Sequence, residues 1–507
     1  MTAAKPALFT PGLMKGLAIG LAVLSMLALN VIPMANNDLW ILMKVGELIV
    51  DTGKIPQTLL FPFTTVQDNH FNAHEWLVSV VFHEFDHLLG LKSLMWIMGA
   101  FALLQFGLCV RLARRQSGSL GAALLLAMLA MICANYRYVM RPELFALLFL
   151  VCVLSVLDRY RSERRTTTLL WTIPIAILWA NCHGSFLLGP GIAGLFAIGE
   201  AWTALQSASG APPARVRAGL RAGLPYAVAT LAMIAASTLN PAGWHLLAFP
   251  FQLQQSEVIR TLIKEWLPTF SPLFVVERAF WIFAVIGVAS CAVVYRLRRH
   301  LCATDLLLFA FFAALALERQ RHIVWFGFVA MTVCARLLGH LRIEARRETQ
   351  LQGTSAGLAL AAIVACMVFG NAGRAHIYYA PSHNFNPVLV RELSDPKVAG
   401  NVFNSYELGG ELIYRDWPRL KPSIDSRVDS YTDDYLLFSI RLLSDEKLLN
   451  LFLEGNRVSY MLLLSRDFNA GVRTMPSVRA NWHIRWTDGD IFLLERNVPL
   501  PAIASPG

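Results

Sequence analysis

The chain contains eleven long apolar blocks, and this feature constrains its fold more than any other. The blocks cover residues 14–34, 92–112, 118–134, 144–158, 168–181, 185–204, 223–239, 279–296, 304–317, 323–341 and 356–372. Most approach the length of roughly 17–25 residues that a helix needs to cross a bilayer core about 30 Å thick. Only 15% of the 507 residues are charged, against roughly 25% in soluble domains. The sequence therefore predicts a helical membrane protein with about eleven transmembrane helices.

The charged residues between the blocks predict the orientation of the chain. Alternate connections hold short basic clusters, at residues 111–115, 159–165, 215–221, 296–299 and 342–347. Such clusters mark the cytoplasmic side of a membrane. An odd number of crossings then takes a cytoplasmic N-terminus to an external C-terminus, in a bacterial inner membrane. This placement accounts for the net charge of +10 without nucleic acid as a partner.

The two ends of the chain differ in character. The first block could instead be a cleaved signal peptide, because Pro33-Met34-Ala35 faintly resembles a cleavage site. Its length favours a retained transmembrane helix. The residues after about 383 alternate between short strands and helices. We therefore predict a membrane domain over residues 1–375 and a periplasmic or extracellular α/β domain over residues 376–507. Strands are expected at residues 398–403, 421–424, 458–464, 482–486 and 491–494, with helices over 405–415 and 434–453.

The first outer loop, residues 35–90, is too apolar and too regular in its pattern to be an unstructured linker. Residues 39–50 and 76–89 have helical spacing of apolar side chains, which predicts two helices lying in the membrane interface. Asp38, behind Asn36 and Asn37, is placed to cap the first helix. Asp38 could act as a general base, with Glu75 as a second acid that orients an acceptor or holds a divalent cation. The structural alternative is that Asp38 only caps a helix and Glu75 is solvated.

Several short outer turns carry cations close to the apolar helix ends. These are Arg137, Arg141, His183, Arg319, Arg321 and His322. Cations are disfavoured on this side, so they require a compensating anion. Guanidinium groups bind phosphate oxygens through two parallel hydrogen bonds, and a phosphate at the interface would serve. Alternatively, these arginine and histidine side chains could extend to lipid head groups or pair with Glu143 and Glu318.

Any group transfer at the outer face needs an activated donor that is carried in the membrane. The sequence has neither a G-x-x-x-x-G-K-[ST] loop nor a G-x-G-x-x-G fingerprint. A polyprenyl-phosphate sugar fits this requirement, since its phosphate is a leaving group that Arg and His can stabilise. We assign substrate binding to His74, Arg141, His183, Arg319, Arg321 and His322, and catalysis to Asp38 and Glu75.

A series of short motifs supports this interpretation. They are Asn37-Asp38-Leu39-Trp40, Gly53-Lys54-Ile55-Pro56, His74-Glu75-Trp76, Arg141-Pro142, His183-Gly184, Asn240-Pro241-Ala242-Gly243-Trp244 and Ile424-Asp425-Ser426-Arg427. Their order resembles a bacterial group of GT-C superfamily membrane glycosyltransferases, distantly similar to protein O-mannosyltransferases and lipid A aminoarabinose transferases. The resemblance implies inverting transfer from a polyprenyl-phosphate-linked sugar to a glycan, lipid or protein acceptor, with Asp38 as catalytic base. Better-known members have a second acid in this loop. Glu75 is our candidate, although it lies farther along the chain than an adjacent pair would.

Two other functions remain open at this stage. His83-Glu84-Phe85-Asp86-His87 matches the H-E-x-x-H motif of zinc proteases, although no downstream motif supplies a third ligand. A transporter or flippase of lipid-linked sugars would also have many helices, but such proteins often show repeated halves, which this sequence lacks. The sequence does not identify a cofactor.

Overall fold

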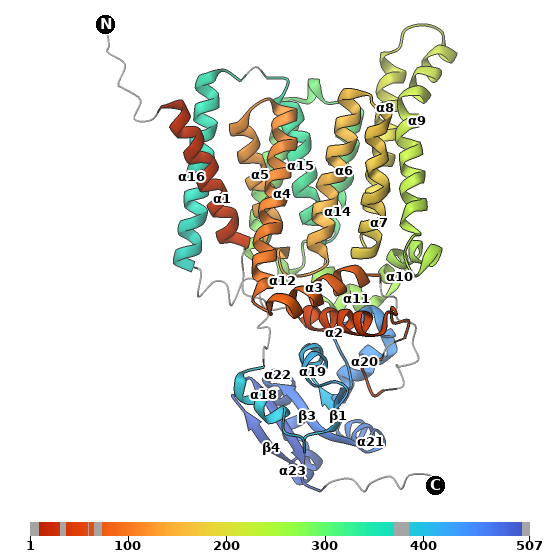
Figure 1. The fold of residues 1–507 in the computed structure, drawn as a ribbon, viewed down its shortest axis with the longest axis vertical. Coiled ribbons are helices and arrows are strands. Elements are labelled where there is room, and N and C mark those ends of the chain that lie inside the picture. The colour runs from red at the N-terminus through yellow and green to blue at the C-terminus, as the bar shows by residue number, and fades with distance from the viewer. Residues whose placement is uncertain are drawn as a thin grey trace. The chain divides into compact units, whose positions relative to one another are not determined.

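The computed structural model of the chain describes residues 10–30, 37–58, 60–64, 74–341, 343–369 and 385–498 (Figure 1). Asn36, Pro33-Met34-Ala35, Arg342 and the predicted domain boundary at residue 375 lie outside these ranges. The chain divides into two compact units. The helical unit comprises Met1–Met34, Lys92–Pro250 and Leu262–Ala380, and the mixed unit comprises Ala35–Leu91, Phe251–Thr261 and Pro381–Gly507.

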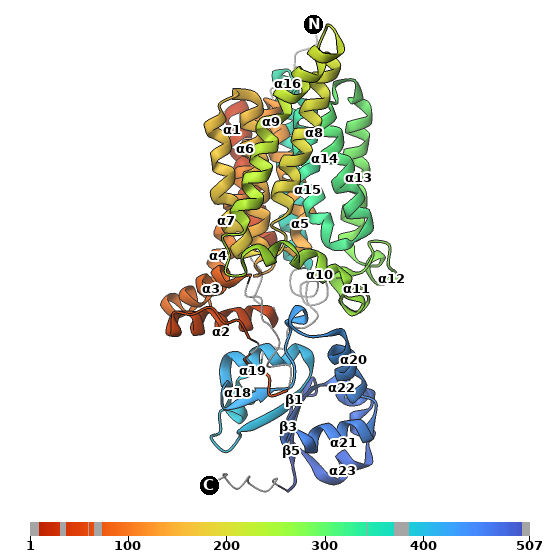
Figure 2. The ribbon, with the colours of Figure 1, turned by 90° about the vertical axis from the view of Figure 1, so that its right-hand side faces the viewer.

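Eight helices within the described residues are long and apolar enough to cross a membrane. They are α1 (Pro11–Asn30), α4 (Ser93–Ser117), α5 (Leu120–Ala134), α8 (Leu188–Ser207), α9 (Pro212–Ser237), α13 (Arg278–Arg296), α15 (Ile323–Leu338) and α16 (Ala345–Phe369). Shorter or more polar helices run beside them in Figures 1 and 2: α6 (Glu143–Glu163), α7 (Thr172–Cys182) and α14 (Ala303–Glu318). Each predicted apolar block corresponds to one of these helices. The predicted membrane helical fold is confirmed, while the exact number of crossings stays a prediction.

The helix ends follow from local sequence. Gly118 has a φ of +69° and ends α4 by donating its N–H to the Arg114 carbonyl, a left-handed conformation that glycine adopts without steric cost. Ser119 then caps α5 by accepting the Ala122 N–H. The connection after α9 contains the short helices α10 (Phe249–Gln255), α11 (Glu257–Leu262), η5 (Lys264–Trp266) and α12 (Pro272–Val275).

The mixed unit is built on a five-stranded sheet of order β2-β1-β3-β5-β4. The strands are β1 (Gly400–Asn404), β2 (Leu420–Pro422), β3 (Val458–Leu464), β4 (Trp482–Thr487) and β5 (Ile491–Arg496). β1 pairs in parallel with β2 and β3, and β5 pairs antiparallel with β3 and β4. These strands confirm the predicted α/β domain.

Helices cover both faces of this sheet (Figure 2). Tyr460 and Leu462 of β3 face α18 (Pro387–Leu393) and α19 (Gly409–Asp416), while Met461 and Leu463 face the other side, as the two-residue period of a strand requires. That second side holds the helices α20 (Asp433–Leu442), α21 (Glu446–Gly455), α22 (Ser465–Ala470) and α23 (Pro476–Asn481). The predicted helix over 434–453 is two helices, because the chain breaks after Leu442 and Asp445 caps α21.

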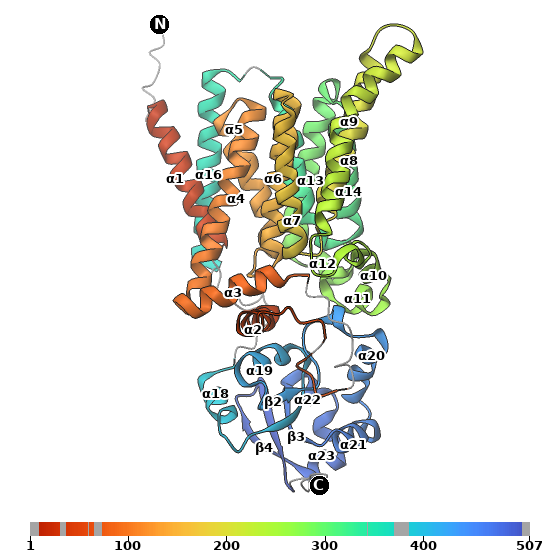
Figure 3. The same cartoon turned by 45° about the vertical axis from the view of Figure 1, so that its right-hand side comes forward.

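The first loop forms the two predicted helices, α2 (Asn37–Thr52) and α3 (Trp76–Leu89), which lie side by side in Figure 3. α2 packs on both α3 and α19 through a core that includes Ile41, Val45 and Ile413. A side chain at Gly46 would meet the Ser79 backbone, and one at Gly410 would lie 2.5 Å from the Asn37 carbonyl oxygen. The loop thus belongs to the same compact unit as the C-terminal domain. Its location in a membrane interface stays a prediction.

Candidate functional site

Three arginines and two glutamates of the helical unit form one polar group, which we call the guanidinium cluster. It consists of Arg137, Arg141, Glu143, Glu265 and Arg321. Arg137 lies in the 3₁₀ turn after α5, Arg141 lies before α6 and Glu143 begins α6. Glu265 belongs to η5, and Arg321 lies in the 3₁₀ turn before α15. Residues far apart in sequence thus meet at one end of the bundle.

The contacts of the cluster are short and charge-assisted. Arg137 Nε donates to Glu143 Oε2 at 2.8 Å, and Arg137 Nη1 lies 2.8 Å from Glu265 Oε2. Arg141 Nη1 pairs with the other Glu265 oxygen, Oε1. Arg321 interacts electrostatically with Arg137 and with both carboxylates. Among the described residues, the cluster therefore brings three guanidinium groups together with two carboxylates.

The charge of Glu265 is fixed by these neighbours. Burial by itself would raise the pKa of this carboxyl, but the guanidinium groups of Arg137 and Arg141 hold it well below its ordinary value. A folded-state pKa below the ordinary value means that Glu265 remains ionised throughout the neutral range. Glu265 therefore keeps its ion pairs with Arg137 and Arg141 at physiological pH.

The turn before α15 and the η5 segment are tied together. Arg319 Nη1 donates to the Trp266 carbonyl at 2.7 Å, and the Arg321 guanidinium lies 3.9 Å from the Trp266 ring centre. Gln320 donates to the Lys264 carbonyl, and Tyr136 donates to the Gln320 carbonyl. This explains how a connection without long helices can hold Glu265 against the arginines.

The predicted cations therefore have different surroundings. Arg141 and Arg321 lie in one cluster. Arg319 and His322 lie on the same turn as Arg321 but bond to backbone, since His322 Nδ1 is 3.1 Å from the Leu315 carbonyl oxygen. His183 lies in the turn between α7 and α8, where its Nδ1 is 2.7 Å from Ser185 Oγ. Glu265 was missed from the sequence, because an acidic residue in a long connection is unremarkable.

The first-loop acids lie in the mixed unit. Asp38 occupies the first turn of α2 rather than the cap position, where a negative charge is favoured by the helix dipole. Asp38 and Asp425 both act on the half-buried Tyr406, whose pKa is raised well above its ordinary value by burial and by these two negative charges. Tyr406 donates its hydroxyl to the Ser426 carbonyl at 2.6 Å. Asp38 thus lies close to the segment that follows β2.

His74 and Glu75 approach that same segment. His74 Nε2 is 3.6 Å from Glu75 Oε1, and Glu75 is the residue before α3. Both interact electrostatically with Asp429, which also acts on Tyr406. The start of α2, the start of α3 and the segment after β2 therefore converge. No motif or pattern in the sequence points to Tyr406 or Asp429.

The Ile424-Asp425-Ser426-Arg427 motif fixes this segment. Asp425 is fully buried, and Arg427 binds it through two hydrogen bonds, from Nε at 3.0 Å and from Nη2 at 2.6 Å. The Arg427 guanidinium also lies 4.8 Å from the ring centre of Phe61. A buried pair with this geometry holds the backbone in one arrangement.

The H-E-x-x-H motif lies on α3, with the His83 and His87 ring centres 5.8 Å apart. Among the described residues, no three His, Cys, Asp or Glu side chains are arranged to hold a metal ion. Asp86, inside the motif, accepts a hydrogen bond from Tyr414 of α19. This polar face of α3 therefore contacts the C-terminal domain.

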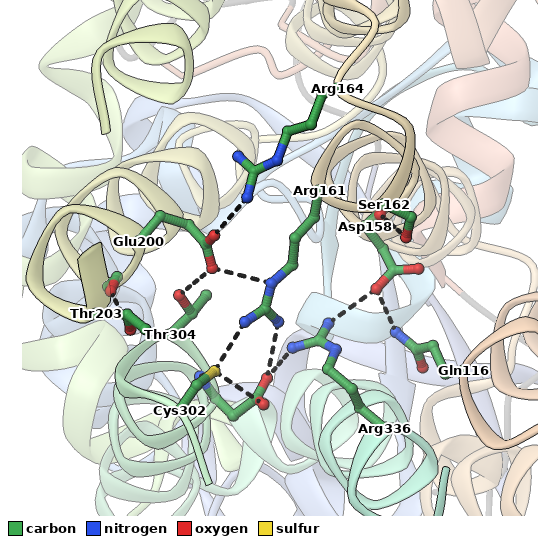
Figure 4. A network of polar contacts seen from close by, with 12 residues as sticks. Gln116, Asp158, Arg161, Ser162, Arg164, Glu200, Thr203, Cys302, Thr304 and Arg336 are labelled. Carbon is green, nitrogen blue, oxygen red and sulfur yellow. Dashed lines mark hydrogen bonds and ion pairs between the residues drawn. The ribbon is translucent and has the colours of Figure 1, made fainter. Parts of the chain in front are cut away.

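A second polar group of the helical unit, which we call the balanced network, is shown in Figure 4. Its charged members are Arg161, Arg164, Arg336, Asp158, Glu200 and Asp305. Arg161 Nε is 2.9 Å from Glu200, and Arg336 pairs with Asp305 and, at 3.2 Å, with Asp158. Here three guanidinium groups meet three carboxylates, and no charge is in surplus.

Among the comparisons with known proteins, the one with solved structures finds similar proteins. No model of a known protein family matches the sequence, and no curated protein sequence does. Solved structures match. AglB from Archaeoglobus fulgidus, an archaeal oligosaccharyltransferase in complex with an inhibitory peptide and a dolichol-phosphate, is 12% identical with a TM-score of 0.57, covering 95% of this chain and 75% of that one.

ArnT from Cupriavidus metallidurans, bound to undecaprenyl phosphate, is 13% identical with a TM-score of 0.51. That match covers 96% of this chain and 99% of ArnT. At such low identity the similarity establishes the fold alone. The chain therefore has the fold of these two proteins, which is the fold implied by the resemblance of its motifs to GT-C glycosyltransferases.

Proposed function

We propose that this protein is a glycosyltransferase of a bacterial inner membrane, which moves a sugar from a polyprenyl-phosphate-linked donor to an acceptor on the outer face. The guanidinium cluster carries this proposal. Arginines from turns far apart in the sequence gather at one end of the helical bundle, an arrangement that suits an anion, and charged groups at membrane depth mark functional sites. The fold is shared with proteins whose structures hold dolichol-phosphate and undecaprenyl phosphate.

In this function the cluster binds the phosphate of the donor. Arg141 and Arg321 supply guanidinium groups beside Arg137. The bond between the sugar's anomeric carbon and the phosphate oxygen breaks, and its electron pair stays on that oxygen. The cluster stabilises the negative charge that develops there, the effect that usually contributes most to such catalysis. The released product is a polyprenyl phosphate.

The first-loop acids, Asp38 and Glu75, act on the acceptor. Asp38 takes the proton from the acceptor hydroxyl as its oxygen forms the new bond to the anomeric carbon, with inversion at that carbon. Glu75, with His74 3.6 Å from it, orients the acceptor. Whether a divalent cation assists Glu75 is left open by the sequence. The convergence of Asp38, His74 and Glu75 near one segment supports a shared task.

Replacing Asp38 with Asn tests this assignment. Loss of a general base lowers rates by about 10²–10⁴-fold, so glycosyl transfer in membranes or detergent should fall at least about a hundredfold. Asp51→Asn, at the exposed other end of α2, is the matched control and should leave transfer near the wild-type rate.

Glu84→Gln separates this function from proteolysis. Transfer should persist in Glu84→Gln, because Glu84 lies within α3 and not at its start. Proteolytic activity that disappears in Glu84→Gln, with no glycosyl transfer by the wild type, would instead establish the zinc hydrolase.

A further inference from the structure

Two fully buried polar side chains of the helical unit have no hydrogen-bond partner among the described residues. Gln105 of α4 is 0% exposed, and neither its amide nitrogen nor its amide oxygen is bonded. Tyr138, which lies between η2 (Asn135–Arg137) and α6, is also 0% exposed, and its hydroxyl is unbonded. A buried polar group without a partner destabilises the fold, so native proteins pair nearly all such groups. Satisfying these two groups therefore requires something other than the surrounding side chains.

The two groups face one region between α4 and α6. Phe101, Gln105 and Cys109 follow one another at four-residue spacing, which puts them on one face of α4. At one end of this row, the ring centre of Phe101 lies 4.6 Å from that of Phe145 in α6. At the other end, Tyr138 interacts electrostatically with the fully buried Cys109. Gln105 lies between these two contacts, so its amide and the Tyr138 hydroxyl share this region.

The bonding capacity of the pair indicates a small neutral ligand. The Gln105 amide offers two N–H donors and a carbonyl acceptor, and the Tyr138 hydroxyl can donate one hydrogen bond and accept another. A ligand that satisfies both groups must therefore donate as well as accept. Because both side chains are closed to solvent, the ligand must also be small. Water fulfils both conditions, and a buried water typically forms about two to four hydrogen bonds with such groups.

We propose that Gln105 and Tyr138 bind one buried water molecule between α4 and α6. The water accepts a hydrogen bond from the amide N–H and donates one to the hydroxyl oxygen. Tyr138 lies between Arg137 and Arg141 in the sequence, so the water ties the turn that carries these arginines to α4. The water site stands independently of the proposed glycosyl transfer.

Radiolytic hydroxyl labelling of the full chain in detergent tests for this water, because radicals formed from a bound water oxidise the side chains beside it even when these are closed to solvent. Tyr138 should be labelled several times faster than Phe328, an aromatic residue of α15 that is also 0% exposed. Gln105→Leu removes the amide and should reduce the labelling of Tyr138 to the level of Phe328. Mass spectrometry of the peptides gives both rates.

Thr172→Val is the matched control. Thr172 is fully buried too, but its hydroxyl already donates to the Leu169 carbonyl at 2.6 Å. The labelling of Tyr138 in this variant should equal that of wild type. Two results would overturn the proposal: labelling of Tyr138 in wild type as slow as that of Phe328, or fast labelling of Tyr138 that persists in Gln105→Leu.

Thermal unfolding gives an independent measurement with a more conservative variant, Gln105→Met, which keeps the length of the side chain. A water-bonded amide contributes to stability, so Gln105→Met should lower the unfolding midpoint. Tyr138→Phe should also lower the midpoint, but should have little further effect in the Gln105→Met background, because the effects of residues that share one partner do not add. An unbonded amide would give the opposite sign. A midpoint that rises in Gln105→Met, with additive effects of the two substitutions, would contradict the proposal.

Discussion

The balanced network and the guanidinium cluster are built from the same helices with opposite results. α6 carries Glu143 at its first residue and Asp158 and Arg161 near its last turn. α15 follows Arg321 and carries Arg336 in its last turn. At one end of these helices three guanidinium groups meet three carboxylates, and at the other end the described residues bring three guanidinium groups together with two carboxylates.

The difference indicates that the two ends serve different purposes. A buried ion pair with complete partners fixes how helices pack, and breaking it costs far more than forming it gains. The balanced network links α6, α8, α14 and α15 in this way. The guanidinium cluster gathers three arginines at turns between helices, which suits the binding of an anion. Substitutions in the balanced network should therefore change the folding stability, and substitutions in the guanidinium cluster should change the affinity for an anion.

The largest effect is expected in the balanced network. Asp305→Ala removes one of the two carboxylate partners of Arg336 and one partner of Arg161, leaving buried guanidinium groups short of negative charge. Loss of one member of such a pair costs about 3–5 kcal/mol of folding free energy. Thermal unfolding of the purified protein in detergent should show a strongly lowered midpoint. A midpoint equal to that of wild type would show that this network does not hold the helices together.

A smaller effect, on binding rather than stability, is expected in the guanidinium cluster. Arg141→Gln removes one charge-assisted contact to phosphate, worth about 1.5–3 kcal/mol, or roughly ten- to a hundredfold in affinity. Binding of a polyprenyl phosphate should weaken by that factor, while the unfolding midpoint changes little because Arg141 is 25% exposed. A large loss of stability without a loss of affinity would place this cluster in the same class as the balanced network.

Arg141→Lys should have a smaller effect than Arg141→Gln. The ammonium group keeps the charge but loses the planar geometry that contacts two oxygens. Affinity for the lipid phosphate should therefore fall between the values for wild type and Arg141→Gln. Equal affinities for the lysine variant and wild type would mean that charge alone, and not guanidinium geometry, is used.

Local sequence determined most of the elements. The length and apolarity of the eleven blocks predict the helices, because a helix satisfies its own backbone hydrogen bonds whatever surrounds it. Residues 76–89 form α3 and residues 458–464 form β3, with the predicted bounds in both cases. Such patterns depend on neighbours within a few residues. Within the candidate site, they name Arg137, Arg141, Glu143 and Arg321 of the cluster and Asp38, His74 and Glu75 of the first loop.

Tertiary structure decided which charges meet. Glu265 lies more than 120 residues from Arg141 and contacts it, and no local pattern in the sequence contains that pairing. Likewise, α2 packs on α19 of the C-terminal domain because Gly410 allows its backbone to approach Asn37 closely, a long-range contact that apolar periodicity does not specify. Hydrophobic burial has no direction and sets only which faces turn inward. The partner of each buried charge follows from the geometry of packing, and so does the grouping of arginines that defines the site.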